Sequence, residues 1–464
     1  MTGSSVVTAA QSTGPTGEAH DVVAGRSSPD EVCRFLTDAV PAILAAALVP
    51  LLPDGIGQVR AVVTRAKLKP GRKLTVSVDV SGDGIAARPA ALGWGASAPS
   101  ALPDALLEQV THAQRSPFST LALPPDASGM SVFLAPVDPA FPQLLDVYDP
   151  ARIARLLSAA GVAGFGEGPR VLAVRYRPGQ RHVVLVESAD GRRRLYAKCY
   201  RDDSGRRAVD ASRIVAEALS RAGGPADTAR AAGYSDSHRL ALWTGHEGMP
   251  LSRVVSGGAD GTPIAVTQGA RAGAALRAIH EGGGRTGVLP DPGAGSRGRS
   301  DPATEAAATR RAVEHVAPLA PQAAARLETL LVETMTELVG LPVEAGHLVH
   351  GDYKCDNMLV DDDRLVLLDF DRVTIGDPAV DVGKFVADLR WWARASNRSA
   401  TALVHAFLDG YGPCPPERLA RASCYDVLFQ LRAVGRRIPL HAPGWAETVD
   451  ACLEATRRSR GSGP

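Results

Sequence analysis

The sequence has few cysteines and almost no net charge, and each shortage argues against a class of protein. Its six cysteines form no C-x-x-C pair and have no histidine at metal-ligand spacing, which argues against a disulfide framework or a zinc site and favours reduced thiols. Lys+Arg 51 against Asp+Glu 50 gives a formal charge of +1, too little to draw the chain to nucleic acid or anionic lipid. We therefore expect neither nucleic acid nor a membrane as partner.

Long apolar runs are also scarce. The longest, Val40–Pro53, is too short to span a bilayer and contains three prolines, so it predicts a buried helix. Residues 1–28 are rich in Ser, Thr, Gly and Ala and have neither the basic start nor the apolar core of a signal peptide. They predict a disordered tail. With 464 residues and 45% hydrophobic content, the chain is expected to form two or three soluble domains in the cytoplasm; its oligomeric state is not predicted.

The most informative stretch is His350–Asp371, in which polar residues interrupt a pattern of apolar strands. The runs Met358–Val360 and Leu365–Leu368 read as two strands joined by the acidic turn Asp361–Arg364. One carboxylate stands just before this predicted hairpin and another just after it. A plain hairpin with a solvated turn would explain the acidic turn but not the flanking polar residues.

Those flanking residues, Asp352, Asn357 and Asp369, fit a phosphoryl-transfer centre. Such a reaction needs a carboxylate that accepts the proton of an alcohol, and carboxylate and amide oxygens that hold Mg²⁺ against a triphosphate. Asp352 fits the first role. Asn357 and Asp369 fit the second.

The pattern D-x-x-x-x-N, an apolar run and then D-F resembles the catalytic loop and metal aspartate of the protein-kinase fold. With Gly351 after His350, Gly376-Asp377-Pro378-Ala379 and Asp381, it looks like the aminoglycoside phosphotransferase and choline kinase group in particular. The resemblance implies a bilobal α+β fold with an antiparallel N-lobe sheet and a mainly helical C-lobe, and ATP and Mg²⁺ as cofactors. It also implies that His350 and Asp381 support the catalytic loop and that Lys354 neutralises the transferred phosphoryl group.

Upstream, a predicted β-hairpin occurs twice. Val171–Tyr176 and Val183–Glu187 flank a Pro-Gly turn, and Val59–Arg65 and Leu74–Val80 flank another about a hundred residues earlier. Only the later hairpin leads into a strand with a lysine, Lys198. Because a kinase N-lobe needs a strand-borne lysine for the α- and β-phosphates, the later copy is the nucleotide-binding one and the earlier copy is a degenerate or cap-like domain.

The remaining nucleotide contacts are assigned by the same resemblance. Glu217, on a predicted helix about twenty residues after Lys198, is expected to pair with that lysine. The hairpin turn, with Arg177, Gly179 and Arg181, is expected to cover the phosphates, and Trp243 lies on the strand leading to the adenine site.

The predicted organisation is a tail over 1–28, a cap-like α+β domain over 29–150, an N-lobe over 151–250 and a C-lobe over 251–455. Only Phe370–Gly376 separate Asp369 from Asp377-Pro378, which leaves no room for a peptide-binding activation loop and favours a small-molecule acceptor. The resemblance suggests an aminoglycoside or another antibiotic, in resistance or biosynthesis. A maltokinase-like sugar kinase and a nucleotide-binding pseudokinase are the alternatives.

Overall fold

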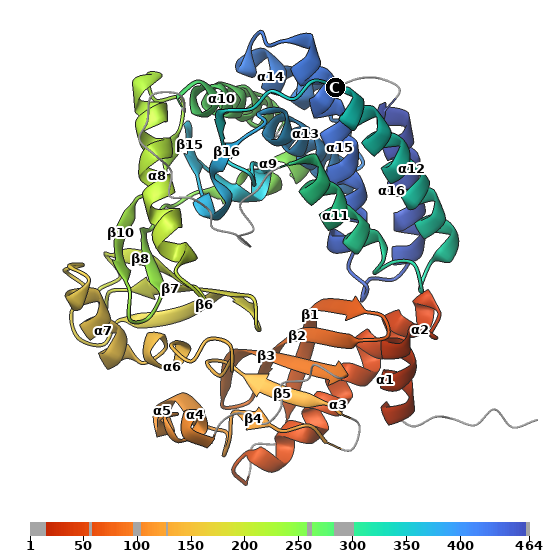
Figure 1. Cartoon of the computed structure of the whole chain (residues 1–464). Helices are drawn as coiled ribbons and strands as arrows, with labels where there is room; N and C mark the ends of the chain where they lie inside the picture. The colour runs from red at the N-terminus through yellow and green to blue at the C-terminus, as the bar shows by residue number, and fades with distance from the viewer. Residues whose placement is uncertain are drawn as a thin grey trace, which may run out of the picture. The chain divides into compact units, whose positions relative to one another are not determined.

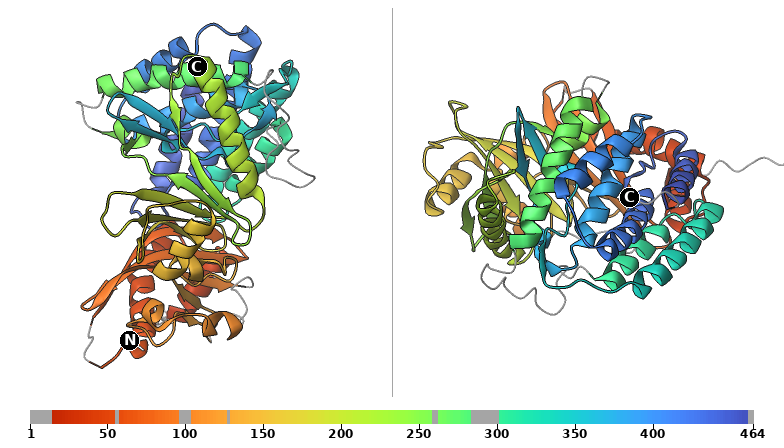
Figure 2. Two further views of the ribbon diagram at one scale, coloured as in Figure 1. Left: turned by 90° about the vertical axis from the view of Figure 1, so that its left-hand side faces the viewer. Right: turned by 90° about the horizontal axis from the view of Figure 1, so that it is seen from above.

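The computed structural model describes residues 15–54, 58–95, 104–126, 129–257, 262–282 and 301–460. The chain divides into two compact units (Figures 1 and 2). Unit 1 comprises Met1–Pro139 together with Pro439–Trp445, and unit 2 comprises Ala140–Ile438 and Ala446–Pro464.

Unit 1 is an α+β domain with one antiparallel sheet of strand order β1-β2-β3-β5-β4. Along β2 every second residue is buried, among them Leu74, Val76 and Val78, as expected for a strand with one face on a core. Its elements are α1 (Pro15–Ala24), α2 (Pro29–Arg34), η1 (Phe35–Ala39), α3 (Val40–Leu48), η2 (Val49–Leu51), β1 (Val59–Lys69), β2 (Lys73–Gly82), β3 (Ile85–Gly95), α4 (Asp104–Glu108), α5 (His112–Arg115), β4 (Ala122–Leu123) and β5 (Ser131–Leu134).

The expectation of a disordered tail over 1–28 is wrong for its second half. Residues 1–14 lie outside the described residues, but α1 is a helix whose Ala19 and Val22 are 2% and 1% exposed. Three residues apart, these two side chains share one helix face, and burying that face orders the helix. Ser28 and Glu31 then form a reciprocal capping box that starts α2.

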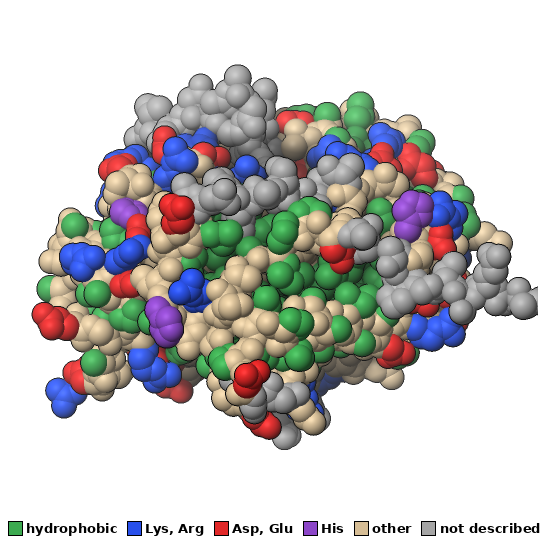
Figure 3. Space-filling view, turned by 90° about the horizontal axis from the view of Figure 1, so that it is seen from below, with side chains coloured by type: hydrophobic (Ala, Val, Ile, Leu, Met, Phe, Trp, Pro, Cys, Tyr) green, Lys and Arg blue, Asp and Glu red, His purple; other side chains and the backbone are tan. Residues whose placement is uncertain are grey.

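Among the described residues, one helical stretch, Pro29–Leu51, has the length and the apolar composition that would allow it to cross a membrane. Its residues Val32, Leu36, Val40 and Leu44 are fully buried in the structure, so it also fits the core helix of a globular unit. The space-filling view from the side on which Figure 1 labels α3 and α4 shows apolar side chains in the middle of that face and charged ones mostly around them (Figure 3).

Unit 2 begins with a second five-stranded antiparallel sheet, of order β6-β7-β8-β11-β10. Val184, Val186, Leu195 and Ala197 form its core with Leu242, on the face packed against α6 and α7. The elements of this N-lobe are α6 (Leu144–Val147), α7 (Pro150–Ala159), β6 (Arg170–Arg177), β7 (Arg181–Glu187), β8 (Arg194–Cys199), α8 (Ser204–Arg221), β10 (Ala231–Ser235) and β11 (Leu240–Thr244).

The two sheets have the same topology, strand for strand. In each, the first hairpin closes through a three-residue Pro-Gly loop whose glycine, Gly71 or Gly179, has a φ of +68° or +64°. The second strand of each sheet begins directly after this loop, at Lys73 in unit 1 and at Arg181 in unit 2. The third residue of that strand is Thr75 or Val183, and its partners on the next strand are Gly93 and Lys198, respectively. The first copy therefore has a glycine at the position of the nucleotide lysine.

The C-lobe is mainly helical and carries two small sheets, of order β12-β14-β15-β9 and β13-β16. Its elements are β9 (Asp227–Thr228), β12 (Met249–Pro250), α9 (Leu251–Ser256), α10 (Thr262–Gly282), α11 (Pro302–Val313), α12 (Pro321–Gly340), β13 (His347–Val349), η4 (Cys355–Asn357), β14 (Met358–Asp361), β15 (Arg364–Leu367), η5 (Phe370–Arg372), β16 (Thr374–Gly376), α13 (Ala379–Ala395), α14 (Thr401–Tyr411), α15 (Pro416–Arg437) and α16 (Trp445–Arg460). The hairpin predicted after the catalytic loop is β14 and β15.

Glycines allow the C-lobe helices to pack closely. A Cβ at Gly410 of α14 would lie 2.0 Å from the carbonyl oxygen of Ala270 in α10, and one at Gly273 would lie 2.1 Å from that of Phe407. A Cβ at Gly383 of α13 would lie 2.3 Å from the carbonyl oxygen of Ala422 in α15. The Gly383 contact holds α13, the helix that carries Asp381 and Lys384, against α15.

The predicted α+β bilobal fold with an additional N-terminal α+β domain is confirmed. The predicted domain boundary at 150 differs from the structure, in which unit 1 ends at Pro139 and α6 belongs to unit 2. The predicted C-lobe also includes Pro439–Trp445, which the structure assigns to unit 1. There the Trp445 indole is 2% exposed and donates a hydrogen bond to the carbonyl oxygen of Pro29.

Candidate active site

The loop after β13 is held by Asp381 at the start of α13. One carboxylate oxygen of Asp381 accepts a hydrogen bond from the backbone N–H of His350 at 2.6 Å, and the other accepts one from Gly351 at 2.8 Å. Gly351 has a φ of +71°, and a Cβ there would lie 2.4 Å from the carbonyl oxygen of Arg372. Only glycine fits this position, and the loop that it allows presents Asp352.

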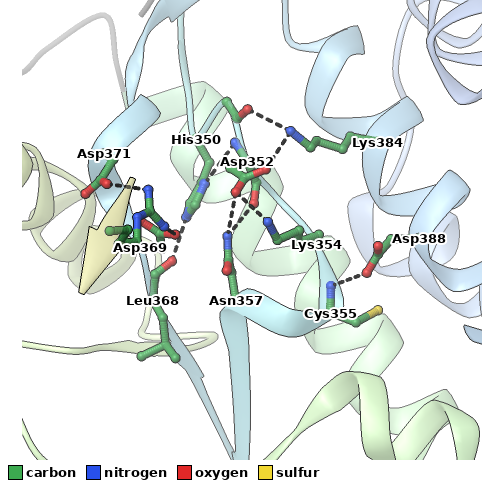
Figure 4. A network of polar contacts seen from close by, with 12 residues as sticks. His350, Asp352, Lys354, Cys355, Asn357, Leu368, Asp369, Asp371, Lys384 and Asp388 are labelled. Atoms are coloured by element: carbon green, nitrogen blue, oxygen red, sulfur yellow. Dashed lines mark hydrogen bonds and ion pairs between the residues drawn. The ribbon is translucent and has the colours of Figure 1, made fainter. Parts of the chain in front are cut away.

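Both oxygens of Asp352 are bound by lysines (Figure 4). Lys354 Nζ lies 2.6 Å from Oδ2, and Lys384 Nζ, from α13, lies 2.6 Å from Oδ1. The side-chain amide of Asn357 donates to Oδ2 at 3.1 Å and to the Asp352 carbonyl oxygen at 2.9 Å. Burial raises the pKa of Asp352, but the positive charges of Lys384 and Lys354 outweigh burial and hold that pKa well below its usual range.

Lys384 is itself buried, and it donates to the carbonyl oxygen of Gly351 at 3.1 Å. Burial lowers its pKa to about 8, against the opposing effect of the Asp352 carboxylate. Its ammonium group also lies 4.8 Å from the centroid of the Phe429 ring, a favourable cation–π distance. Lys384 therefore fixes Asp352 from the helix side, while Lys354 holds it from within the loop.

A second cluster gathers the carboxylates of Asp369 and Asp371. Lys198 Nζ lies 2.8 Å from Asp369 and 2.6 Å from Asp371. Arg181 bridges the same two carboxylates at 2.9 and 2.8 Å, and the hydroxyl of Tyr200 donates to Asp371 at 2.8 Å. Burial raises the pKa of Asp369, but the positive charges of Lys198 and Arg181 outweigh burial and lower that pKa far below its ordinary value.

Asp369 adopts a left-handed backbone conformation, with φ +65° and ψ +69°. Residues other than glycine rarely adopt it, and such positions are concentrated at functional sites. The conformation turns the chain out of β15 into η5, so that Asp369 and Asp371 reach the same ammonium group.

The predicted pairing of Glu217 with Lys198 is wrong. Glu217 lies on the solvent side of α8, 56% exposed, and forms an ion pair with Arg221 one turn further on. The buried stripe of α8 runs through Ala211, Val215 and Ala218, so the helical period turns Glu217 away from the sheet. The ammonium group of Lys198 is instead bound by Asp369 and Asp371.

The other expected nucleotide residues lie along the same side of the N-lobe sheet or in its first turn. Arg177 is the last residue of β6, Gly179 lies within the β6–β7 loop, and Arg181 is the first residue of β7. Trp243 lies on β11 and is buried, with its ring centroid 6.2 Å from that of Phe370, the residue after Asp369. His350 is buried and its Nε2 lies 3.2 Å from the carbonyl oxygen of Leu368; burial lowers its pKa, which favours the neutral ring.

No sequence motif identifies Lys384 or Tyr200 as residues of the site, and the resemblance assigns no role to Asp371. A signal for Lys384 was available, since it is one of only six lysines beside 45 arginines. All three lysines of unit 2, Lys198, Lys354 and Lys384, bind a carboxylate of this site.

The donor set fits Mg²⁺ bound together with a nucleoside triphosphate. The described residues contain no group of three or more His, Cys, Asp or Glu side chains that would hold a metal alone. Mg²⁺ commonly takes one or two carboxylates and completes its shell with phosphate and water oxygens. Asp369 and Asp371, which both bind the Lys198 ammonium group, would supply the carboxylates, and the Asn357 side chain, whose amide nitrogen donates to Asp352, would supply its oxygen.

A two-lobed fold, with a strand-borne lysine in one lobe and a buried aspartate loop in the other, defines a kinase-like phosphotransferase. The chain matches the phosphotransferase enzyme family over residues 172–422, more than half of its length. It belongs to this family and is therefore a phosphotransferase. No curated protein matches the chain.

Solved structures of similar proteins cover about two thirds of the chain. A choline/ethanolamine kinase family protein from Mesorhizobium loti is 16% identical, over 67% of this chain and 97% of that one, with a TM-score of 0.43. An aminoglycoside phosphotransferase in complex with ADP and hygromycin B is 16% identical, over 67% and 99%, with a TM-score of 0.44. An amicoumacin kinase is 14% identical, over 68% and 95%, with a TM-score of 0.44.

Proposed function

We propose that the protein transfers the γ-phosphoryl group of ATP, as a Mg²⁺ complex, to a hydroxyl group of a small molecule in the cytoplasm. One observation carries the proposal: Asp352 is fixed through both oxygens by Lys354 and Lys384, close to a separate pair of carboxylates held by Lys198 and Arg181. The first group suits an alcohol and the second suits a metal-bound triphosphate.

In this reaction the acceptor oxygen forms a bond to the γ-phosphorus as the bond from that phosphorus to the β,γ-bridging oxygen breaks, and ADP leaves. The hydroxyl proton passes to Asp352, which the two lysines keep ionised and oriented. Lys198 and Arg181 would bind phosphate oxygens, and Asp369, Asp371 and Asn357 would hold Mg²⁺. Bound there, the metal would neutralise the charge of the phosphates. Most of the rate enhancement would come from positioning and fixed charges.

Lys354 has a further role in the proposal. Its side chain is 23% exposed, so its ammonium group can reach an incoming phosphoryl group while staying near Asp352. An antibiotic acceptor, in resistance or in biosynthesis, is the finer proposal that the family resemblance implies, and choline-like alcohols and sugars are the other classes to test.

Intact-mass measurement is the direct test. The protein is incubated with ATP and Mg²⁺ and with pools of aminoglycosides, nucleoside and peptide antibiotics, choline-like alcohols and sugars, and products are sought that gain the mass of one phosphate. Asp352→Asn keeps the shape of the base but cannot accept the proton. It is expected to lower kcat by several orders of magnitude and to leave the Kd of a non-hydrolysable ATP analogue within about threefold. Near-wild-type turnover by this variant would rule out the assignment.

A further inference from the structure

The wall next to Asp352 on the helical side carries an excess of positive charge. Lys354 and Lys384 are two of these positive charges. The guanidinium groups of Arg372 and Arg432 are two more, and each interacts electrostatically with the Asp352 carboxylate. Arg436, one turn after Arg432 on α15, adds a fifth cation beside Arg432 and Arg372. These residues come from the catalytic loop, η5, α13 and α15, so the tertiary fold, not one sequence run, brings them together.

Only one further carboxylate is described within this group. Glu305 of α11 is 1% exposed and lies 2.5 Å from Arg432 Nη1, an ion pair that neutralises that arginine. Its other oxygen is 3.4 Å from Arg372, a long contact. The neighbouring Asp388 is already paired with Arg437. These five cations therefore face two carboxylates, Asp352 and Glu305, and Arg311 of α11 adds a sixth positive charge near Arg436.

Arg372 and Arg436 carry the uncompensated charge. The Arg372 side chain is 31% exposed and has only the long contact with Glu305 among its described ion pairs. Arg436 reaches solvent, and its described hydrogen bond is a 3.4 Å contact with the carbonyl oxygen of Ala308. Partial desolvation, together with the positive charges of Arg432 and Arg372, lowers the pKa of Arg436 to about 10 although the side chain has access to solvent.

Such an arrangement favours an anion and disfavours a cation. Guanidinium groups bind carboxylate and phosphate oxygens through paired N–H donors. A polycationic acceptor would instead bring its ammonium groups against Arg372 and Lys384, where Asp352 and Glu305 are already paired with cations.

We propose that the acceptor is a hydroxylated small molecule with a carboxylate or phosphate group, and that Arg372 and Arg436 bind this group and so hold the hydroxyl at Asp352. This inference rests on the proposed function and names its substrate class. Among antibiotics it favours acidic ones over aminoglycosides.

The test separates anion binding from turnover. Sulfate binding is measured calorimetrically with the nucleotide site saturated by AMP-PNP and Mg²⁺. Arg372→Gln and Arg436→Gln are each expected to weaken sulfate binding at least fivefold and to leave AMP-PNP affinity within twofold. Arg457→Gln, which removes an exposed arginine of α16, is the control and should change neither. Arg372→Lys, which keeps the charge, should restore part of the affinity.

Turnover is then compared on matched acceptors, hydroxy acids and sugar phosphates against their methyl esters, amides and amino analogues. The acidic members are expected to be phosphorylated, and the two glutamine variants should raise their KM at least tenfold while kcat changes less than threefold. Equal turnover of the neutral or amino analogues, or sulfate binding that is unchanged by both variants, overturns the inference while leaving the phosphotransferase intact. Arginine-dependent sulfate binding with no phosphorylated product from any acceptor would instead reject the proposed function.

Discussion

At the scale of the residue, the site depends on which carboxylate binds which cation. Asp371 accepts from Lys198, Arg181 and Tyr200, whereas Glu217 makes a solvent-exposed pair with Arg221. Exposed ion pairs contribute little, and hydrogen bonds to charged groups contribute about 1.5–3 kcal/mol.

We therefore expect Asp371→Asn to lower kcat/KM for ATP by about 10- to 100-fold, because it weakens the hold on Lys198 and on the metal site. Glu217→Gln, an equally small change on the same lobe, should leave kcat/KM within about twofold. Steady-state kinetics with varied ATP measure both. A large loss in Glu217→Gln would mean that Lys198 changes partner during turnover.

Lys384 makes stability depend on pH in a defined direction. Burial lowers its pKa to about 8 in the folded chain, below the ordinary value of 10.5. Below pH 8 the group is protonated in both states, and between about 8 and 10.5 the unfolded chain holds a proton that the folded chain has released. Raising the pH through this window therefore favours folding through this group.

The comparison with Lys384→Met isolates this effect from other titrating groups. The Tm of the wild type is expected to rise relative to that of the variant as the pH increases from 7.5 to 10, as measured by thermal unfolding in matched buffers. A constant difference across that range would show that Lys384 has an ordinary pKa.

Much of this residue-scale picture could be predicted from the sequence, and its limit is physical. Asp352, Asn357 and Asp369 lie within eighteen residues and carry a spacing that local structure preserves, so the pattern alone placed them. Arg372, Arg432 and Arg436 acquire their meaning only when η5 and α15 pack together. No local pattern distinguishes them from the other arginines of an arginine-rich chain. Glu217 follows Lys198 at the distance along the chain that the family resemblance predicts, but the helical period of α8 turns the Glu217 side chain toward solvent.

At the scale of the element, helix contacts in the C-lobe require glycine at particular positions. A methyl group at Gly410 would lie 2.0 Å from the carbonyl oxygen of Ala270, so α10 and α14 would have to separate. At Gly269, on the same pair of helices, the nearest atom would be 3.5 Å away, an ordinary contact.

Gly410→Ala is therefore expected to destabilise the protein by about 1–3 kcal/mol through overpacking. Gly269→Ala should be neutral or stabilise it by up to about 1 kcal/mol, because alanine favours the helix. Chemical denaturation of the two variants and the wild type provides the measurement. Equal stabilities of the two variants would contradict the close approach of α10 and α14.

At the scale of the whole molecule, the chain contains two sheets of one topology but the residues of one nucleotide site. Gly93 occupies in unit 1 the register position that Lys198 occupies in unit 2. The repeated Pro-Gly hairpin predicted this relation from the sequence. The shared order of all five strands could not be predicted, because β4 and β5 are short and their pairing with β3 is not local.

One nucleotide should therefore bind per chain. Calorimetric titration with AMP-PNP and Mg²⁺ is expected to give a stoichiometry near one for the wild type, and Lys198→Met should weaken all of the binding, not half of it. A stoichiometry of two, or a site that is unaffected in Lys198→Met, would assign a working nucleotide site to unit 1.

The passage of Pro439–Trp445 into unit 1 bears on the order in which the chain can mature on the ribosome. Trp445, with its hydrogen bond to Pro29, belongs to unit 1, yet Ala140–Ile438 of unit 2 are translated before it. Domains generally fold from the N-terminus as they emerge. Unit 1 can therefore complete its core, with the buried indole of Trp445, only after Ala140–Ile438 of unit 2 have been synthesised.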